Sequence, residues 1–171
     1  KSLPDLALLP ESNPALGLRG MRIFMHYPQL LVAQLRALLR AAVHGDLRMM
    51  LPMVATPADL VWGRAQISDV AAALSQEGIE HRVDVPFGAM IETPAAAMTV
   101  DLLAPLADFF SLGTNDLAQY TLAADRTVSE LAQRYPSNAP AVWRLVENAA
   151  RAARAANRPL SVCGELAGIP Q

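Results

Sequence analysis

The chain has 171 residues, of which 53% are hydrophobic, and its formal net charge is −2 at pH 7. This composition predicts one folded unit with a buried core and excludes an extensively disordered chain. The weak negative charge, with no basic run interleaved with aromatic residues, argues against nucleic acid as a partner. No run approaches 18 apolar residues and the N-terminus lacks a signal-peptide pattern, so we expect a cytoplasmic protein without membrane insertion.

The segment up to residue 18 contains prolines but no sustained hydrophobic period, so we expect it to be irregular. Asn13-Pro14 is a turn signal, and Gly17 and Gly20 follow it on either side of Arg19. Glycines allow the backbone to approach another group closely. Arg19 is therefore either a ligand-facing residue or an arginine that is solvated or paired with a carboxylate.

The next expected elements are an amphipathic helix and a buried strand. Leucines recur at three- and four-residue spacing after Pro28, which suits a first-turn position, and Gly45 suits the end of the helix. The apolar run over residues 47–54 then predicts a strand, with Pro52 near its end. Arg48 lies within this run.

A second helix and a second strand follow in the same order. Thr56-Pro57-Ala58-Asp59 resembles a capping box with proline at the first helical position, and the helix that it opens is expected to end near Gln76. The apolar run over residues 85–91 predicts the strand. It ends in Glu92-Thr93-Pro94, where Thr93 would cap a helix over residues 95–103, so a carboxylate lies at the end of this strand.

The third strand, over residues 109–112, leads into the polar cluster Thr114-Asn115-Asp116. These side chains either cap the following helix or present an amide and a carboxylate to a ligand at the C-terminal end of a parallel strand. An amphipathic helix over residues 140–156 then leads to the fourth strand, over residues 160–163. Asn157 suits a left-handed turn between them.

Four apolar strands joined by helices indicate a parallel α/β sheet. An open doubly wound sheet and a (β/α) barrel both fit this order. Glu92, Asn115, Asp116 and Cys163 all fall at the C-terminal ends of strands, which a barrel would bring to one mouth. A complete barrel needs eight strands and roughly 250 residues. We therefore expect an α/β fold that is part of a (β/α)8 TIM-type barrel, with about half of the strands in this chain.

Cys163 is the only cysteine of the chain. It cannot form an internal disulfide, and it leaves no Cys/His cluster for zinc. On these grounds Cys163 is either a buried small apolar residue or a reactive thiol.

Five motifs together resemble one family. They are, in chain order, Asn13 to Arg22, Arg48 to Met53, Ile91-Glu92-Thr93-Pro94-Ala95, Ser111 to Arg126 and Cys163-Gly164-Glu165-Leu166-Ala167-Gly168. Their order and spacing over nearly the whole chain resemble the phosphoenolpyruvate (PEP)-utilising enzymes. The similarity is greatest to the C-terminal PEP-binding domain of enzyme I of the bacterial sugar phosphotransferase system, or of multiphosphoryl transfer proteins. Leu166-Ala167 after Cys-Gly-Glu resembles enzyme I more than pyruvate phosphate dikinase.

The resemblance implies a role for the residues at the strand ends. Glu92 and Asp116 would hold one Mg²⁺, a cation that takes oxygen ligands and commonly uses only one or two carboxylates. Guanidinium groups suit phosphate and carboxylate oxygens, and an amide can donate to phosphate. The implied substrate-binding residues are Arg19, Arg48, Asn115 and Arg126.

The implied reaction transfers the phosphoryl group of PEP to a histidine and releases pyruvate. Positioning and charge neutralisation provide most of the catalysis of such a transfer. The enolate that remains must be protonated at carbon, and the family pattern makes Cys163 the general acid, since a thiol is mostly protonated at neutral pH. Glu165 would orient the Cys163 loop, add to its polar surroundings or form a structural ion pair.

The resemblance also implies partners. None of His26, His44 and His81 lies in a context like that of the family's phosphorylated histidine, so the acceptor would be a phosphohistidine domain of the same protein and, through it, the histidine-containing carrier protein. Residues 1–171 would be a piece of one PEP-binding barrel domain of a homodimer, inactive in isolation. The alternatives are a dikinase or PEP synthase domain and a non-catalytic dimerisation fragment, because missing strands leave sheet edges unpaired.

Overall fold

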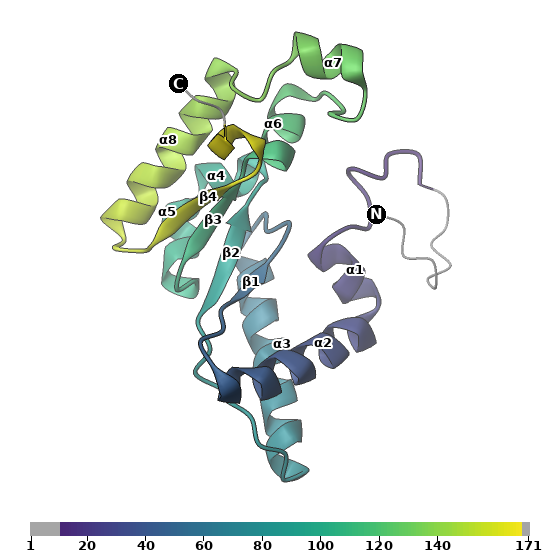
Figure 1. Ribbon diagram of the computed structural model, residues 1–171, viewed down its shortest axis with the longest axis vertical. Helices are drawn as coiled ribbons and strands as arrows, with labels where there is room; N and C mark the ends of the chain where they lie inside the picture. The colour runs from purple at the N-terminus through teal and green to yellow at the C-terminus, as the bar shows by residue number, and fades with distance from the viewer. Residues whose placement is uncertain (1–10, 169–171) are drawn as a thin grey trace.

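The computed structural model of the chain describes residues 11–168. Four parallel strands form one sheet in chain order, as Figure 1 shows, and they are β1 (Met49–Leu51), β2 (Phe87–Ile91), β3 (Phe110–Gly113) and β4 (Leu160–Cys163). Helical segments connect each strand to the next, so the order is that of consecutive units of a (β/α) barrel. The predicted fold class, an α/β fold that is part of a TIM-type barrel, is confirmed.

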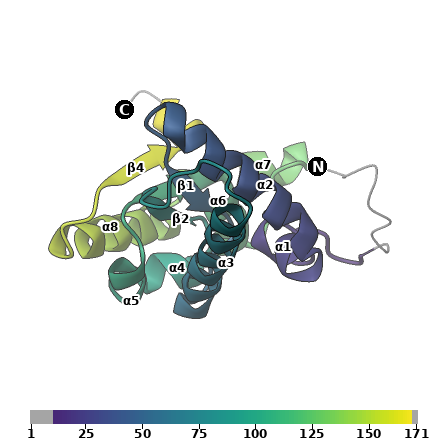
Figure 2. The same cartoon turned by 90° about the horizontal axis from the view of Figure 1, so that it is seen from below.

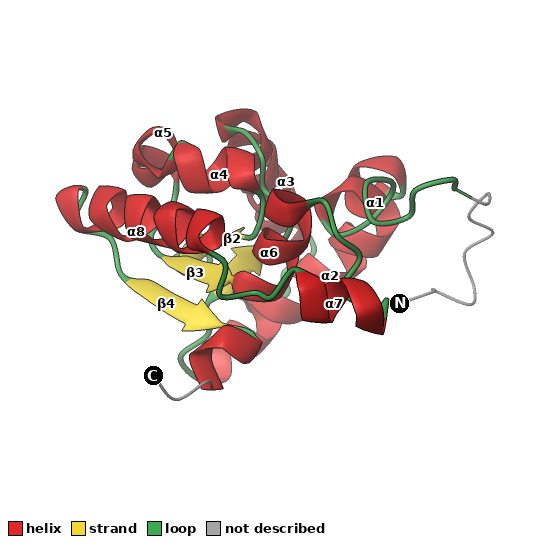
Figure 3. Ribbon diagram, turned by 90° about the horizontal axis from the view of Figure 1, so that it is seen from above, coloured by secondary structure: helices red, strands yellow, loops and turns green. Residues whose placement is uncertain are grey.

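The helices lie before, between and after the strands. The α-helices are α1 (Met21–His26), α2 (Pro28–Ala41), α3 (Pro57–Gln76), α4 (Pro94–Met98), α5 (Val100–Leu103), α6 (Thr114–Leu122), α7 (Ser129–Arg134) and α8 (Pro140–Ala155). Three short 3₁₀ helices are η1 (Ala42–His44), η2 (Ala104–Leu106) and η3 (Glu165–Gly168). Helices α4, α5 and α8 lie together on one side of the sheet in Figure 3, and α2 packs against α3. Seen from below in Figure 2, α1 lies at the opposite end of the molecule from α8.

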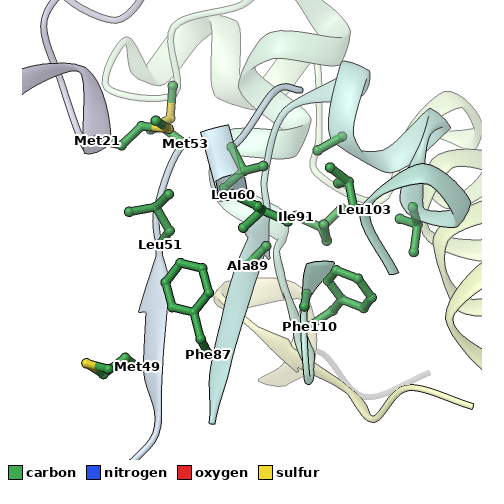
Figure 4. Packing of buried hydrophobic residues seen from close by; sticks show 14 of the residues in the cluster. Met21, Met49, Leu51, Met53, Leu60, Phe87, Ala89, Ile91, Leu103 and Phe110 are labelled. Atoms are coloured by element: carbon green, nitrogen blue, oxygen red, sulfur yellow. The ribbon is translucent and has the colours of Figure 1, made fainter. Parts of the chain in front are cut away.

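Alternate strand residues point to the helices and form the core. Figure 4 shows Phe87, Ala89 and Ile91 of β2 in this layer, together with Leu60 of α3 and Leu103 of α5. All five are almost completely buried, and burial of apolar surface is the main favourable term in folding. Because successive side chains of a strand point to opposite faces, the intervening strand positions face the inner side of the partial barrel.

The first predicted strand is shorter than its apolar run. Residues 47–54 were expected to be extended, but β1 covers only Met49–Leu51. Pro52 has no N–H to donate to a neighbouring strand, and Met53 adopts a left-handed conformation with φ 57°. The chain therefore leaves the sheet at Pro52.

The predicted helix over residues 95–103 is wrong as a single element. Thr93 caps α4 as predicted, since its hydroxyl oxygen accepts a hydrogen bond from the Ala96 N–H at 3.1 Å. At Thr99 the backbone leaves helical geometry, with φ −123° and ψ 29°, and the Thr99 hydroxyl donates to the Ala95 carbonyl at 2.8 Å. This local bond competes with helix continuation and separates α4 from α5.

Other boundaries agree closely with the sequence. Helix α3 ends at Gln76 as expected, and the helix from Pro28 ends at Ala41, with η1 before Gly45. Asn157 has the predicted left-handed conformation, with φ 53°. The irregular N-terminal segment was predicted over residues 1–18, of which 1–10 lie outside the described residues and 11–18 form only turns and bends. Between residues 11 and 168, no helix is long and apolar enough to cross a membrane.

Candidate active site

The C-terminal strand ends bring most of the predicted site residues to one edge of the sheet. Glu92 follows β2 directly, α6 follows β3 and Cys163 ends β4. Gly113, the last residue of β3, lies so close to Glu92 that an added Cβ would be 2.8 Å from its Cβ and 3.0 Å from its Oε2. Only glycine leaves room for the Glu92 side chain at this point.

The polar cluster after β3 forms the first turn of α6. Thr114, Asn115 and Asp116 are helical residues and the N-cap is Gly113, so the interpretation of these side chains as caps is wrong. The Thr114 hydroxyl donates to the Cys163 carbonyl at 3.0 Å, and Asn115 Oδ1 accepts from the Glu165 N–H at 3.0 Å. These bonds join α6 to the loop after β4.

Asp116 is the most constrained carboxylate of the group. Its side chain is 12% exposed, and its Oδ2 accepts a hydrogen bond from the Arg19 guanidinium at 2.8 Å. Its Oδ1 is buried and has no hydrogen-bond partner among the residues that the structure describes, although an Arg126 nitrogen lies 3.6 Å away. A buried carboxylate oxygen without a partner is costly, which indicates that a ligand completes its surroundings.

Tyr120 of α6 holds Arg19 in place. The Arg19 guanidinium donates to the Tyr120 hydroxyl oxygen at 2.9 Å, and that hydroxyl donates in turn to the Ala15 carbonyl. Burial raises the pKa of Tyr120, so the hydroxyl keeps the proton that this second bond needs. Arg19 is thus paired with a carboxylate, which was one of the two interpretations of this residue, and its role towards a ligand stays a prediction.

The turn after β1 positions Glu92. Glu92 is 8% exposed, and its Oε1 accepts a hydrogen bond from the Met53 N–H at 2.6 Å. The left-handed conformation of Met53 fits against Gly20, where a Cβ would lie 2.6 Å from Met53 Cγ. The expected close approach at Gly20 is therefore present.

The surroundings of Glu92 favour its protonated form. Burial raises the pKa of Glu92 above its usual range, and the negative charge of Asp116 acts in the same direction. The Met53 N–H and the positive charges of Arg19 and Arg126 oppose this rise without cancelling it. A divalent cation between the two carboxylates would reverse the balance, because opposite charge favours the ionised form.

The raised pKa predicts how Glu92 affects stability. Between its ordinary pKa and the raised value, the folded state binds more protons than the unfolded state, so stability falls as pH rises through this interval. Glu92→Gln cannot ionise and can still accept the Met53 hydrogen bond. With divalent metal removed by a chelator, we expect this variant to melt at a higher temperature than the wild type at pH 7.5, and the difference to shrink towards pH 4.

Glu77→Gln is the matched control for this melting experiment. Hydrogen bonding to Arg36 lowers the pKa of Glu77, so its contribution is present above its ordinary pKa and is lost as pH falls. The Glu77 substitution should not raise the melting temperature at pH 7.5. A Glu92→Gln variant with an unchanged pH profile would contradict the assignment of a raised pKa to Glu92.

Cys163 lies at the end of β4 and is partly buried. Its S–H donates to the Leu112 carbonyl at 3.1 Å, and the Ser111 hydroxyl lies 3.4 Å from its Sγ. Glu165, two residues further on, is exposed and uses its backbone N–H to bind Asn115. No ion pair of the Glu165 side chain is found within residues 11–168.

The structure does not bring Arg48 to the other predicted residues. Arg48 precedes β1 at the N-terminal end of the strand, and its guanidinium carbon lies 5.8 Å from the centre of the Phe109 ring. Phe109 in turn precedes β3. Arg48 is therefore separated from Glu92, Asp116 and Cys163 by the length of the strands.

Sequence reasoning assigned no role to Met53, Tyr120 or Ser111. All three lie within the motifs that carry the family resemblance, which is the signal that could have drawn attention to them. The left-handed turn at Met53 has no local sequence signal, because the residue is neither glycine nor asparagine. The contact between Tyr120 and Ala15 joins residues 105 positions apart, which no local pattern reveals.

The donor set fits Mg²⁺. Glu92 and Asp116 supply carboxylate oxygens, and Asp116 Oδ1 lacks a hydrogen-bond partner in the described part of the chain. No cluster of three or more His, Cys, Asp or Glu side chains suited to a metal occurs within the same residues. Mg²⁺ is commonly bound by only one or two carboxylates, together with water and substrate oxygens. A pocket lined in part by Asn115, Arg126 and Glu165 lies between α6 and α7, and neither Glu92 nor Asp116 is among its lining residues.

Comparison with known proteins agrees with this geometry. The family described as PEP-utilising enzyme, PEP-binding domain, matches the chain over residues 1–171. This chain belongs to the PEP-utilising enzyme family.

Curated relatives carry one common name. The chain is 44% identical over 168 residues to phosphoenolpyruvate-protein phosphotransferase of Priestia megaterium, covering 98% of this chain and 29% of the relative. It is 45% identical over 170 residues to the protein of the same name from Enterococcus faecalis, covering 98% of this chain and 30% of the relative. The chain thus spans less than a third of the length of these relatives.

A solved structure supports the fold. A citrate lyase from Burkholderia xenovorans superimposes with a TM-score of 0.57 and 26% sequence identity, over 77% of this chain and 40% of that one. This chain therefore shares its fold with a protein of a different name, so the functional argument depends on the residues at the strand ends.

Proposed function

We propose that this chain binds PEP together with Mg²⁺ and serves the transfer of the PEP phosphoryl group to a histidine of another domain, with release of pyruvate. The observation that carries the proposal is the Asp116 carboxylate, buried between Arg19 and Arg126 with Oδ1 left without a hydrogen-bond partner in the described structure. The names of the relatives support the reaction class.

In this proposal, Glu92 and Asp116 hold the cation. Bound Mg²⁺ supplies charge neutralisation for the phosphate and enolate oxygens of the substrate. The Met53 N–H holds Glu92 through its Oε1, and Arg19 holds Asp116 through its Oδ2. Both carboxylates would thus be fixed in place before a cation binds.

The substrate is held by groups that surround the carboxylates. Arg19 is oriented by Tyr120 and Asp116, and its planar guanidinium can contact phosphate oxygens at the same time. Arg126 has a half-exposed side chain and reaches the site from the end of α6. Asn115 Oδ1 is bound by the Glu165 N–H, so the amide Nδ2 is the end that faces a ligand as a donor. Together these groups bind an anion and orient it for in-line transfer.

Protonation of the enolate completes the reaction. Cys163 ends β4 at the same edge of the sheet, and its S–H donates a hydrogen bond to the Leu112 carbonyl. We assign Cys163 as the general acid that protonates carbon. The chain is proposed to be one part of a single PEP-binding barrel domain, with the phosphohistidine domain and the carrier protein as partners of the complete protein and a homodimer as its assembly.

Cys163→Ala separates binding from chemistry. We expect the full-length protein with this substitution to bind PEP with unchanged affinity, because the thiol contacts neither carboxylate, and to form pyruvate at least 100-fold more slowly, in the range typical of a lost general acid. Calorimetry and a pyruvate assay measure the two quantities. If Cys163→Ala lost PEP binding, the general-acid assignment would be wrong.

The test of the proposed function is a calorimetric titration of PEP with and without Mg²⁺. Metal-dependent binding to the full-length protein that carries this chain is the expected result. Phosphoglycolate and oxalate, which resemble parts of PEP and its enolate, serve as competitors. A PEP affinity that did not depend on Mg²⁺ would contradict the assignment of Glu92 and Asp116 as metal ligands.

A further inference from the structure

Ser111 places a buried hydroxyl beside the Cys163 sulfur. Ser111 lies in the middle of β3, is 6% exposed, and its Oγ is 3.4 Å from Cys163 Sγ. Strands β3 and β4 are neighbours (Figure 1), and Gly113 pairs with Cys163, so Ser111 and Cys163 point to the same inner face. Within residues 11–168, the Ser111 hydroxyl has no other hydrogen-bond partner.

A neutral thiol is a weak hydrogen-bond partner for a buried hydroxyl. Thiol sulfur accepts hydrogen bonds weakly, and a buried hydroxyl with only a weak partner costs free energy. A thiolate is a far better acceptor, since hydrogen bonds to a charged group are stronger than those between neutral groups. The hydrogen bond from Ser111 is therefore most stabilising when the Cys163 sulfur carries a negative charge.

The Leu112 carbonyl and the Ser111 hydroxyl have opposite effects on the ionisation of the Cys163 sulfur. The Leu112 carbonyl lies 3.1 Å from Sγ and accepts a hydrogen bond from its S–H, an interaction that only the thiol can make. The Ser111 hydroxyl donates weakly to the neutral sulfur and would donate more strongly once the proton has left, so it favours the thiolate. Met90 Sδ, at 3.7 Å, is a neutral neighbour.

We propose that Ser111 is a positioning residue that stabilises the Cys163 thiolate as the thiol gives up its proton. The inference rests on the proposed function of Cys163 as general acid. In that step, the S–H bond breaks and its electron pair stays on sulfur, while the proton forms a C–H bond with the enolate carbon. The Ser111 hydrogen bond strengthens as the charge develops, so it acts mainly on the transition state.

The pH dependence of Cys163 alkylation tests this proposal directly. The full-length protein is treated with iodoacetamide at a series of pH values, and the peptide that contains Cys163 is quantified by mass spectrometry. In Ser111→Ala, the pH of half-maximal alkylation rate should rise by roughly one unit, because a lost hydrogen bond to a charged group is worth about a tenfold change in the thiolate equilibrium. A change in accessibility alone would alter the plateau rate and leave this midpoint in place.

Two further variants make the result specific. Ser111→Thr keeps the hydroxyl and should keep the wild-type midpoint. Ser161→Ala is the matched control, since Ser161 lies on the same inner face and its hydroxyl binds the Phe110 carbonyl, at 3.4 Å. The charged groups at this edge are the same in all variants, namely Arg19, Glu92, Asp116, Arg126 and Glu165. A midpoint that moved equally in Ser161→Ala, or not at all in Ser111→Ala, would overturn the proposal.

Turnover provides a second, independent measurement. Ser111→Ala should lower kcat for pyruvate formation about tenfold and leave KM for PEP unchanged, because the hydrogen bond forms with the thiolate and not with bound substrate. If alkylation shifts while turnover is normal, Ser111 stabilises the thiolate but Cys163 is not the general acid, so the proposed function fails at that step. If neither changes, the Ser111 inference fails and the role of Cys163 stands.

Discussion

Asp116→Asn is expected to abolish the Mg²⁺ dependence of PEP binding in a protein that still folds. The substitution keeps the size of the side chain and an oxygen acceptor for Arg19, but it removes the negative charge from a carboxylate whose buried Oδ1 has no hydrogen-bond partner in the described structure. We expect the PEP affinity measured in Mg²⁺ to fall by roughly 100-fold, since loss of a residue that only orients a metal ligand already costs about 10–100-fold. Affinity without metal should fall little, since Arg19 and Arg126 remain. Calorimetric titration with and without Mg²⁺ measures both.

Asp108→Asn is the matched control for this experiment. Asp108 also pairs with an arginine, at 3.2 Å from Arg64, but it lies before β3 at the opposite end of the strand. Its substitution should leave metal-dependent binding intact. Equal losses in the two variants would indicate a general effect on folding, and an Asp116→Asn protein with wild-type Mg²⁺ dependence would remove Asp116 from the metal site.

Gly113→Ala should reduce both stability and metal-dependent PEP binding, because the added Cβ would lie too close to three atoms already there. The new Cβ would be 2.8 Å from both Glu92 Cβ and Met90 Sδ and 3.0 Å from Glu92 Oε2. Glu92 is held in place by the Met53 N–H, so it cannot move aside without losing that bond. We expect a loss of stability of about 1–3 kcal/mol, as for other overpacked sites, and a loss of metal-dependent PEP binding in the protein that remains folded.

Gly45→Ala controls for the loss of glycine itself. Gly45 has an extended backbone that any residue adopts, and no atom lies within 4 Å of a Cβ added there. This variant should melt and bind like the wild type. Chemical denaturation gives the stability of both proteins, and calorimetry gives their affinity. A stable Gly113→Ala protein with normal metal-dependent binding would show that Glu92 tolerates displacement.

The sequence predicted helices and strands well where one local signal dominates. Four apolar runs marked the strands, and helix α3 was bounded by a proline at its start and Gly78 after its end. Prediction failed where a single side chain changed the local balance, as Thr99 does by bonding to Ala95 and dividing one helix into two. The six-residue helices α1 and α7 are too short for a hydrophobic period to be recognised.

The sequence predicted which strand ends form the candidate site, but it did not predict the hydrogen bonds that connect the site residues. Topology alone brings Glu92, Asp116 and Cys163 to one edge, because they follow neighbouring parallel strands. The same rule could have separated Arg48, which precedes its strand. The roles of Met53 and Tyr120 depend on a left-handed backbone and a long-range hydrogen bond, and neither property is encoded in nearby residues.

The ion pair between Arg19 and Asp116 has a consequence for folding. It joins residues 97 positions apart, and the chain between them contains β1, β2, β3 and most of the core. Contacts of such long range form only after the intervening loop has closed, and closure is slow because it is entropically costly. The two halves of the anion site therefore meet only in a chain whose sheet is already assembled. Under the proposed function, a partly folded chain would not bind PEP, so PEP binding would report the fraction of molecules that have reached the native sheet.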